Sequence, residues 1–571
     1  MFFKKSLDYN LFRHLNETKG SLFCVLLIVI QLFKLFESNG QSLDFRLIDG
    51  EHRISGTFGE FRGSHFHSGI DLKTGGREGI PVFAVADGYV SRVLISRNGY
   101  GKALYINHQN NLTTVYAHLR AFSPPLENLI RPKQLAKQSF ETEFYPDKGS
   151  VPIKKGEIIG YVGNTGSSEG PHLHFETRHT DKEKPFDPSL LGFKFKDTIP
   201  PRLESLLVYD LPNEKLDYPL ESPRVFNSEK IDTISVGDYS LLGLNFYDLA
   251  GNETNRLGIK TVELKVNGKT KFQFQLSDFK FNQSRYISGI LDQGMRNMGI
   301  ESFLCHKPPR LELPFYTSGK HLGILHLPKD SLLNCEITLG DINGNTTSKK
   351  FTLINNSQNQ QSTESLKEAC KLLSPDEEQL FDIGNMQFIL EKNSLLDSSC
   401  IWLDSSYTDH QIISHILPNS VPLLKPMKIM VEHKSLNLKN SNKVIIAKRD
   451  QENNWTSLST KSDQGWLSAS SNTMGEFTLI EDVVSPTCSS PKYFKDDFTR
   501  KTALSLILKD NLSGIGDFTC TINHKWVPAE FYPSRNELII YNIDKYTGQT
   551  LKIVAKDKCG NMLVEKMKIE F

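Results

Sequence analysis

The chain of 571 residues is long enough for three or four domains, and its 67 basic residues nearly balance its 66 acidic residues. The formal net charge of +1 argues against a surface built for nucleic acid or for an anionic membrane. None of the 8 cysteines lies within residues 41–198, so a thiolate metal site and a cysteine nucleophile are excluded from that part of the chain.

Residues 1–40 have the pattern of an export signal. Basic residues precede an apolar run over 22–30, and the small residues Ser38 and Gly40 offer a cleavage site after Gly40. The apolar run is shorter than the roughly 20 residues that cross a membrane. We therefore expect an exported protein of the periplasm or cell envelope, with an uncleaved N-terminal membrane anchor as the alternative.

Two separated groups of metal-binding side chains follow the leader. His67 and Asp71 are four residues apart, and His172 and His174 are two apart, so a strand would place both of the latter imidazoles on one face. A catalytic zinc usually has three ligands from His, Asp and Glu and keeps one position open for water. The two groups together supply enough ligands for such a site.

A third motif, Tyr116–Leu119, adds His118 after a short apolar run over 103–106 that is typical of a neighbouring strand. A lone histidine is more often an ordinary core or surface residue. Here three motifs with four histidines occur in one glycine-rich β segment, which favours a metal site.

These motifs resemble those of the M23 or lysostaphin-type zinc metallopeptidases, which cut peptide cross-links in bacterial cell walls. The resemblance covers about a quarter of the chain and implies an N-terminal antiparallel β-sheet metallopeptidase domain over residues 41–198. The matching segments are Gly56–Gly59, His67–Asp71, Pro81–Gly88, Gly99–Gly101, Tyr116–Leu119, Lys155–Gly160, Gly163–Gly166 and Gly170–Glu176.

The resemblance also implies a role for each site residue. The zinc ligands would be His67, Asp71 and His174. The catalytic residues acting on the attacking water and on the developing oxyanion would be His118 and His172. A neutral histidine suits proton transfer because its unperturbed pKa lies close to the working pH.

Two further side chains of this segment need a separate interpretation. Glu176 would lie on the same strand face as His174 and could orient one imidazole as a partner behind the metal ligands, although a surface carboxylate is the alternative. His65 is a spare imidazole whose spacing to Asp71 does not fit the family's pattern, so we do not expect it to bind the metal.

The implied substrate is the stem or cross-bridge peptide of peptidoglycan, and the family analogy favours the D-alanine to diaminopimelate cross-link over glycine bridges. Two other classes of protein remain open. A catalytically silent wall-binding protein, or an activator of another wall hydrolase, would keep the fold without hydrolysis. An iron oxygenase also uses two His and one Asp, but its usual H-x-D spacing differs from the one here.

A long connection over residues 120–150 departs from the commonest family pattern. It contains a predicted helical turn, and we expect it to overhang the cleft. It would be either a lid or substrate wall, which could also inhibit the enzyme, or a surface loop.

The rest of the chain predicts β-rich modules, so the expected fold is mainly β. Asp248, Asp341 and Asp557 each begin a D-x-x-G-N turn after an apolar or alternating run, which resembles the closing hairpin of bacterial immunoglobulin-like domains. The predicted units are an immunoglobulin-like β-sandwich over 199–355, a β-sandwich module over 366–482 and an immunoglobulin-like domain over 483–571.

These modules would position the enzyme against the wall or against an envelope protein, or act as spacers. Predicted linkers lie at Pro200-Pro201 and over 355–361. Seven cysteines are scattered beyond the leader, and an exported protein can form disulfides, but the spacing does not assign their pairing.

Overall fold

The computed structural model describes residues 43–251, 254–316, 323–355, 370–408, 411–432, 434 and 443–571. The predicted leader over 1–40 and the linker residues 356–361 lie outside these ranges. Within them, no helix has the length and apolar character needed to cross a membrane. Strands dominate every unit, which confirms the prediction of a mainly β protein.

The N-terminal unit consists of a nine-stranded antiparallel sheet and a three-stranded sheet. The large sheet runs in the order β1 (Ile54–Gly56), β2 (Ile70–Lys73), β11 (His172–His179), β6 (Leu112–Ala117), β5 (Lys102–Asn107), β4 (Gly88–Ile95) and β8 (Thr142–Phe144), with β12 (Lys184–Phe186) paired to β11 and β9 (Pro152–Ile153) paired to β4. The small sheet runs in the order β3 (Pro81–Phe83), β10 (Ile158–Val162) and β7 (Leu119–Phe122).

Alternating side chains of these strands form the core of the unit. Leu173 and Phe175 of β11 are fully buried in a cluster with Leu72 of β2 and Leu104 of β5. Because successive side chains of a strand point to opposite faces, the histidines between and beside them must point the other way. The apolar alternation therefore determines which face of β11 carries the polar chemistry.

The connection over residues 120–150 contains a complete helix, α2 (Pro124–Lys137), where the sequence predicted only a turn. Pro124 suits the first helical position, Glu127 lies in the first turn, and Gln138 ends the helix with a left-handed backbone. Leu126 and Ile130 are buried four residues apart, on one helical face.

Three β-rich modules follow, and each consists of two sheets. Module A (residues 202–354) contains β14 (Arg224–Asn227), β13 (Arg202–Leu211), β16 (Tyr239–Tyr247), β19 (Phe303–Leu304) and β20 (Leu325–His326) in one sheet, and β15 (Thr233–Ser235), β22 (Thr346–Ile354), β21 (Leu332–Gly340), β17 (Thr261–Val266) and β18 (Lys269–Gln275) in the other. It also contains α3 (Gln293–Asn297) and the 3-10 helix η4 (Phe281–Gly289).

Module B (residues 371–481) has a six-stranded and a five-stranded sheet. The first contains β23 (Lys371–Leu373), β26 (Ser399–Thr408), β27 (Gln411–Leu417), β33 (Gly475–Glu481), β29 (Val444–Arg449) and β30 (Trp455–Ser457), and the second β24 (Gln379–Ile383), β25 (Met386–Leu390), β28 (Met427–Glu432), β32 (Trp466–Ser471) and β31 (Lys461–Asp463). A disulfide joins Cys370 to Cys400 of β26, a pairing that the spacing had left open. The other described cysteines are free.

Module C (residues 487–568) has a five-stranded and a four-stranded sheet. The first contains β34 (Thr487–Cys488), β35 (Lys492–Lys495), β36 (Thr502–Lys509), β40 (Glu537–Tyr541) and β39 (Glu530–Tyr532), and the second β38 (Lys525–Trp526), β37 (Ile515–Ile522), β41 (Thr550–Asp557) and β42 (Met562–Lys568). Leu551, Ile553 and Ala555 of β41 alternate into the core, as their spacing predicts. That modules A and C are immunoglobulin-like stays a prediction.

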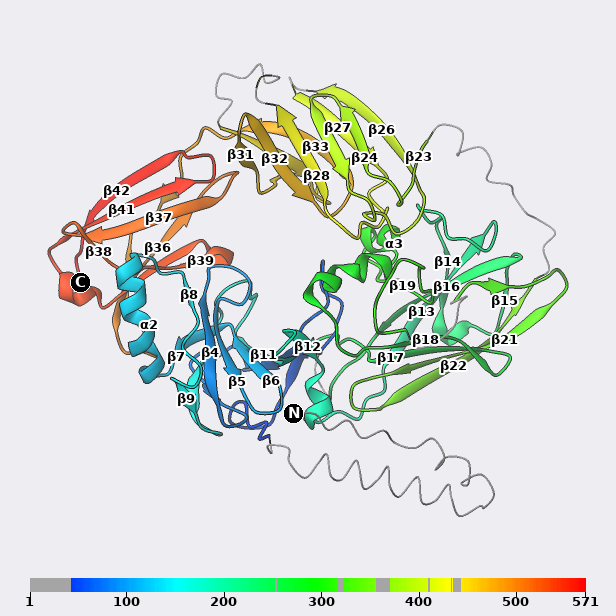
Figure 1. Ribbon diagram of the computed structural model, residues 1–571, viewed down its shortest axis with the longest axis horizontal. Helices are drawn as coiled ribbons and strands as arrows, with labels where there is room; N and C mark the ends of the chain where they lie inside the picture. Colours follow the sequence, from blue (N-terminus) through cyan, green and yellow to red (C-terminus); the bar gives the residue numbers. More distant parts are fainter. Residues whose placement is uncertain are drawn as a thin grey trace, which may run out of the picture.

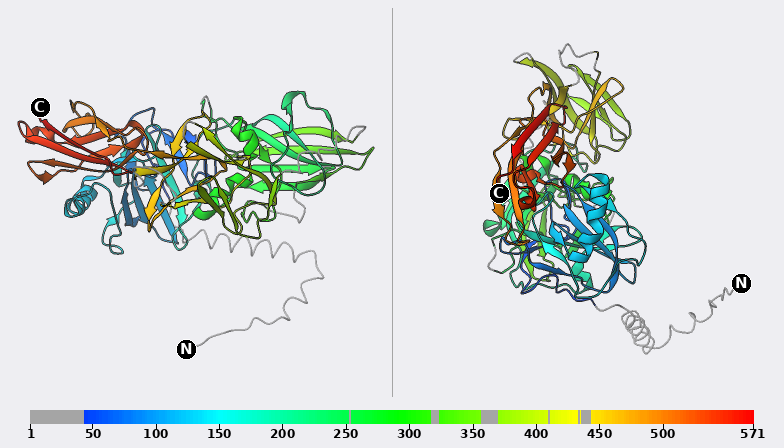
Figure 2. Two further views of the ribbon diagram at one scale, coloured as in Figure 1. Left: turned by 90° about the horizontal axis from the view of Figure 1, so that it is seen from above. Right: turned by 90° about the vertical axis from the view of Figure 1, so that its left-hand side faces the viewer.

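The four units close into a ring, because module C returns to the N-terminal unit beside α2 (Figure 1). Viewed edge-on in Figure 2, the ring is flat. One continuous apolar cluster joins Phe58 and Phe66 of the N-terminal unit to the cores of modules A and B. The N-terminal unit is therefore contacted by module A at one end of the series of modules and by module C at the other end.

Ion pairs close the ring between module C and the N-terminal unit. Lys102 Nζ lies 2.9 Å from Glu530 Oε1, and both side chains are largely buried. Arg120 bridges Glu78 of the N-terminal unit and Asp496 of module C. Tyr161 packs against Phe498 with ring centroids 4.7 Å apart.

The Lys102–Glu530 pair gives a test of ring closure. Losing one partner of a buried pair typically costs about 3–5 kcal/mol, because the other charge stays desolvated. We expect Glu530→Lys to release module C and to raise the radius of gyration measured by small-angle X-ray scattering. The swap Lys102→Glu with Glu530→Lys should restore the compact value. Glu452→Lys on the exposed surface of module B is the control, and an unchanged radius in Glu530→Lys would contradict the assignment.

Candidate metal centre

The site is built by the register of β11 between two neighbouring strands. On one side His174 lies opposite Asp71 of β2. On the other side it lies opposite Ala117 of β6, the residue that precedes His118 in the sequence. Directly opposite residues on antiparallel strands project on the same face and lie close together. The pairing therefore brings motifs about a hundred residues apart in the chain into one cluster.

Three ligand atoms converge in this cluster. His67 Nε2 lies 3.1 Å from Asp71 Oδ1 and 3.0 Å from His174 Nδ1, and His174 Nδ1 lies 2.9 Å from Asp71 Oδ1. All three side chains are buried. Two imidazole nitrogens and one carboxylate oxygen in a compact triangle are the donor set expected for zinc.

The second nitrogen of each ligand histidine already has a partner. His67 Nδ1 is 2.8 Å from the carbonyl oxygen of Thr57, and His174 Nε2 is 2.9 Å from Glu176 Oε1. Each of these oxygens accepts an N–H, which leaves the lone pair of the other ring nitrogen pointing into the triangle. The tautomers required for metal binding are thus set by the surrounding structure.

Glu176 is the centre of a buried network that the sequence indicated only weakly. Its side chain has no exposed surface, and it accepts hydrogen bonds from Ser68 Oγ at 2.6 Å, from the Tyr100 hydroxyl at 2.5 Å and from Arg178 Nε at 2.6 Å. Although burial opposes it, Arg178 and His174 hold the pKa of Glu176 well below its usual value. The surface-carboxylate alternative is therefore wrong, because Glu176 is a buried anion facing His174.

His118 and His172 lie beside the triangle, with ring centroids 4.8 Å apart. Their Nδ1 atoms face backbone carbonyls, that of Thr165 at 2.8 Å for His118 and that of Gly170 at 2.8 Å for His172. Burial, followed by the neighbouring His172 and His174, lowers the pKa of His118 to about 3. His118 is therefore a neutral imidazole at pH 7.

Arg62 is a site residue that spacing did not reveal. Its Nη2 lies 2.8 Å from Asp71 Oδ2, the carboxylate oxygen that points away from the triangle. The guanidinium neutralises the buried carboxylate and orients its other oxygen toward the two histidines. No periodic signal links Arg62 to Asp71, since a loop separates them.

Comparison with known proteins assigns a family to this part of the chain. Residues 65–136 and 148–188 match Peptidase family M23. We call this part of the chain the M23 domain after this match. The match is interrupted at 137–147, inside the predicted insertion. Residues 370–482, which include module B, match the Zu5-like domain family.

The two curated relatives compared below each match a quarter of the chain or less. The chain is 38% identical over 112 residues to the DD-carboxypeptidase/endopeptidase Mpg of Neisseria meningitidis, or 20% of each chain. It is 30% identical over 132 residues to the murein hydrolase activator NlpD of Escherichia coli, or 23% of this chain and 27% of the relative. The catalytic domain of the M23 protein EnpA of Enterococcus faecalis matches with 26% identity, 25% of this chain, 92% of that chain and a TM-score of 0.19. The chain spans about a fifth of the first curated relatives.

The ligands and the two further histidines line a groove of about 850 Å³. One wall comes from module A, through Asn255, Phe281 and Ser284. The guanidinium carbon of Arg178 also lies over the Phe281 ring, 4.5 Å from the centroid of that ring. The groove is therefore shared between the M23 domain and module A, which the sequence did not predict. His65 lies in the groove wall outside the ligand triangle.

The prediction that residues 120–150 overhang the cleft is wrong. None of these residues, all of which the structure describes, lines the groove. Instead Pro124, Glu127 and Arg131 of α2 line a separate cavity together with Phe498 and Glu530 of module C. The insertion therefore lies where module C closes the ring. The buried apolar face of α2 packs against the face of the sheet that is opposite the metal centre.

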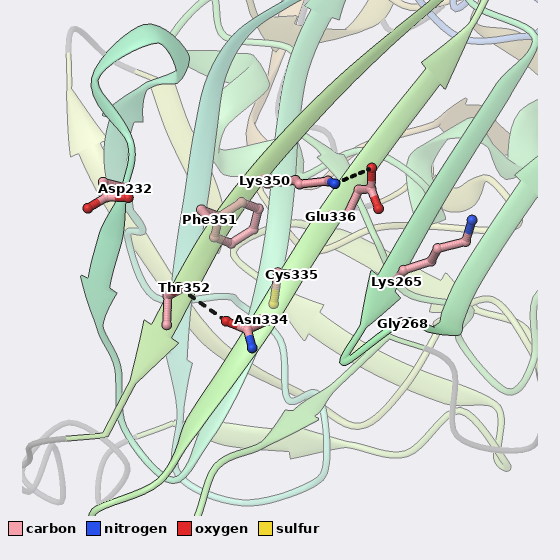
Figure 3. Close-up of a pocket in the computed structure, with 9 residues that line it drawn as sticks. All are labelled: Asp232, Lys265, Gly268, Asn334, Cys335, Glu336, Lys350, Phe351 and Thr352. Atoms are coloured by element: carbon pink, nitrogen blue, oxygen red, sulfur yellow. Dashed lines mark hydrogen bonds and ion pairs between the residues drawn. The ribbon is translucent and has the colours of Figure 1, made fainter.

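Another hollow lies on the β15-β22-β21-β17-β18 sheet of module A (Figure 3). It has a volume of about 390 Å³. Two pairs of its polar side chains contact each other, in the ion pair of Lys350 with Glu336 and the hydrogen bond from Thr352 to Asn334. No set of three metal-ligating groups in the described part of the chain falls in this hollow.

Metal content tests the ligand triangle. We expect the purified chain to bind one zinc ion in the M23 domain, and His174→Ala and Asp71→Ala to lose it, because two remaining ligands rarely hold zinc. Zinc is measured by inductively coupled plasma spectrometry after equilibrium dialysis. His65→Ala, which changes an imidazole of the same groove, should keep its zinc. Equal loss in His65→Ala and His174→Ala would refute the ligand assignment.

Proposed function

We propose that the M23 domain is a zinc-dependent metalloendopeptidase that hydrolyses peptide cross-links of bacterial peptidoglycan in the cell envelope. The observation that carries the proposal is the convergence of His67 Nε2, Asp71 Oδ1 and His174 Nδ1 beside two further imidazoles in one groove. This arrangement has the parts that hydrolysis of an amide needs: a metal-binding triangle, proton-transfer groups and a substrate groove.

The residues of the triangle fit a zinc ion. His67, Asp71 and His174 would hold it, and their outward atoms are already engaged by Thr57, Glu176 and Arg62. A zinc ion bound there would activate water and polarise the scissile carbonyl. Glu176 would act as a positioning residue, since it holds the tautomer and orientation of His174.

His118 and His172 would carry the proton transfers. In each ring Nε2 is the nitrogen available for proton transfer, because Nδ1 faces a backbone carbonyl in both. His118 would accept a proton from the attacking water at Nε2. His172 Nε2 lies 3.5 Å from Asp71 Oδ1, so it faces the same reaction centre, and with a proton on both ring nitrogens it would donate Nε2–H to the developing oxyanion.

The substrate class rests on the relatives. The Neisseria protein is described as a DD-carboxypeptidase/endopeptidase, which supports a peptide of peptidoglycan as the substrate here. An extended peptide would lie along the groove between the M23 domain and Phe281 of module A. Modules B and C would then hold this groove against the wall or an envelope partner.

A second function is supported by the similarity to the murein hydrolase activator of Escherichia coli. In that case the chain would bind the wall or another hydrolase without cleaving peptides. Against this alternative, both candidate proton-transfer residues and all three candidate ligands are present in the groove.

Product analysis separates the two functions. A chain that begins at residue 41 is incubated with purified peptidoglycan, and the soluble muropeptides are identified by mass. We expect zinc-dependent release by the wild type and none by His174→Ala, with product masses that name the bond. Bound zinc without any released muropeptide would favour the activator.

The roles of the two proton-transfer histidines have a separate test. We expect His118→Asn and His172→Asn to keep their zinc but to lower kcat by about 10²–10⁴, the usual contribution of general acid–base groups. Rates of muropeptide release and zinc content are measured on the same samples, with His108→Asn on the other face of the sheet as the control. Activity within a few-fold of the wild type in both variants would rule out these roles.

A further inference from the structure

Three aspartates meet where the M23 domain joins module A. Asp197 lies in the connection after the M23 domain, Asp248 directly follows β16, and Asp341 directly follows β21. One carboxylate oxygen of each lies within 4.8 Å of those of the other two. In the part of the chain that the structure describes, no Lys or Arg forms an ion pair with any of these carboxylates.

The carboxylate of Asp248 is buried without a partner. Asp248 is only 1% exposed, and neither Oδ1 nor Oδ2 has a hydrogen-bond partner among the described residues. Asp197 Oδ2 lacks a partner in the same way. A buried carboxylate without a partner is costly, so it indicates a missing positive charge at this point.

The third aspartate is held in place by its own hairpin. Asp341 Oδ1 accepts the backbone N–H groups of Asn343 at 2.8 Å and Asn345 at 2.9 Å. Asn345 Nδ2 donates to Asp341 Oδ2 at 2.7 Å and also to the backbone carbonyl of Asp197 at 3.4 Å. The hairpin thus fixes one carboxylate and ties the connecting segment beside it.

The acid–base properties agree with a cluster of uncompensated charge. Burial, followed by the charges of Asp197 and Asp341, raises the pKa of Asp248 to about 7. Burial also raises the pKa of Asp341. A bound cation would reverse this repulsion and allow all three carboxylates to ionise.

We propose that Asp197, Asp248 and Asp341 bind a calcium ion at the junction between the M23 domain and module A. The cluster offers only oxygen donors, which favour hard cations over zinc and softer metals. Calcium accepts several carboxylates from separate segments in a flexible geometry, whereas magnesium keeps more of its water and uses one or two. Three carboxylates from three chain segments fit calcium better.

The same arrangement occurs at the junction between modules B and C. Asp482, Asp510 and Asp557 also bring one oxygen each within 4.8 Å of one another. Asp557 accepts from Asn561 N at 2.8 Å and from Asn561 Nδ2 at 2.6 Å, just as Asp341 does from Asn345. Asp510 Oδ1, like the oxygens of Asp248, has no partner among the described residues. The repetition at two junctions supports a shared purpose for the D-x-x-G-N turns.

The proposed ion would hold one wall of the catalytic groove. Ala250 and Leu257, on either side of the same loop, pack into the core of the M23 domain. Asn255 of this loop lines the groove and accepts from Lys73 Nζ at 2.6 Å. Calcium at Asp248 would therefore fix module A against the M23 domain. The proposal does not depend on hydrolysis, because its test measures binding.

Calcium binding is measured on the zinc-loaded full chain by equilibrium dialysis against calcium-free and calcium-containing buffers, with calcium and zinc both determined. We expect Asp248→Asn to bind one calcium ion fewer per chain than the wild type and to lose part of the calcium-dependent rise in Tm. Zinc content should not change. Asp463→Asn, which alters an exposed carboxylate of β31, should match the wild type.

The calcium-free samples show whether a variant that binds less calcium is still folded. In the absence of calcium, Asp248→Asn should have a Tm equal to or above that of the wild type, because the substitution removes a repelling charge. If this variant does not fold, Asp197→Asn provides the same comparison. No calcium bound by the wild type, equal calcium in the wild type and the folded variant, or binding of magnesium in preference to calcium would overturn the proposal.

Discussion

The register of β11 between β2 and β6 is the constraint on which the metal centre depends. It sets His174 opposite Asp71 and beside the end of β6, where His118 begins the next turn. A shift of one residue would turn every side chain of β11 to the other face and bury the imidazoles in place of Leu173 and Phe175. Because burying those two apolar side chains is strongly favourable, the core itself holds the ligands in register.

A second layer of buried charge makes this geometry rigid. Arg62 lies on one side of the ligands and binds Asp71, while Arg178 lies on the other side and binds Glu176. Each guanidinium offsets a carboxylate that would otherwise be costly to bury. The protein itself thus orients the ligand atoms, which is how metal sites keep their donors in place.

The ring of modules makes the groove a property of the whole chain. Module A supplies Phe281 and Asn255 to one wall, and module C returns through Lys102 and Glu530 to the opposite side of the M23 domain. The acidic clusters lie at two of the junctions in this ring. Cations at these points would add an ionic link to the hydrophobic contacts of the same junctions.

The mainly β fold, the strand carrying His172 and His174, and the M23 resemblance could all be predicted from the sequence, because alternation and short motifs are local properties. The length of α2 could not be predicted, because the buried face of this helix is recognisable only from the residues that it contacts in the folded structure. Arg62 with Asp71, Lys102 with Glu530, and Asp197 with Asp248 and Asp341 are partners that only the tertiary structure brings together. Such pairs are separated by up to 428 residues and leave no periodic signal. The sequence by itself determined which chemical groups are present and which strand face carries them; the packing of sheets and modules decided which groups meet.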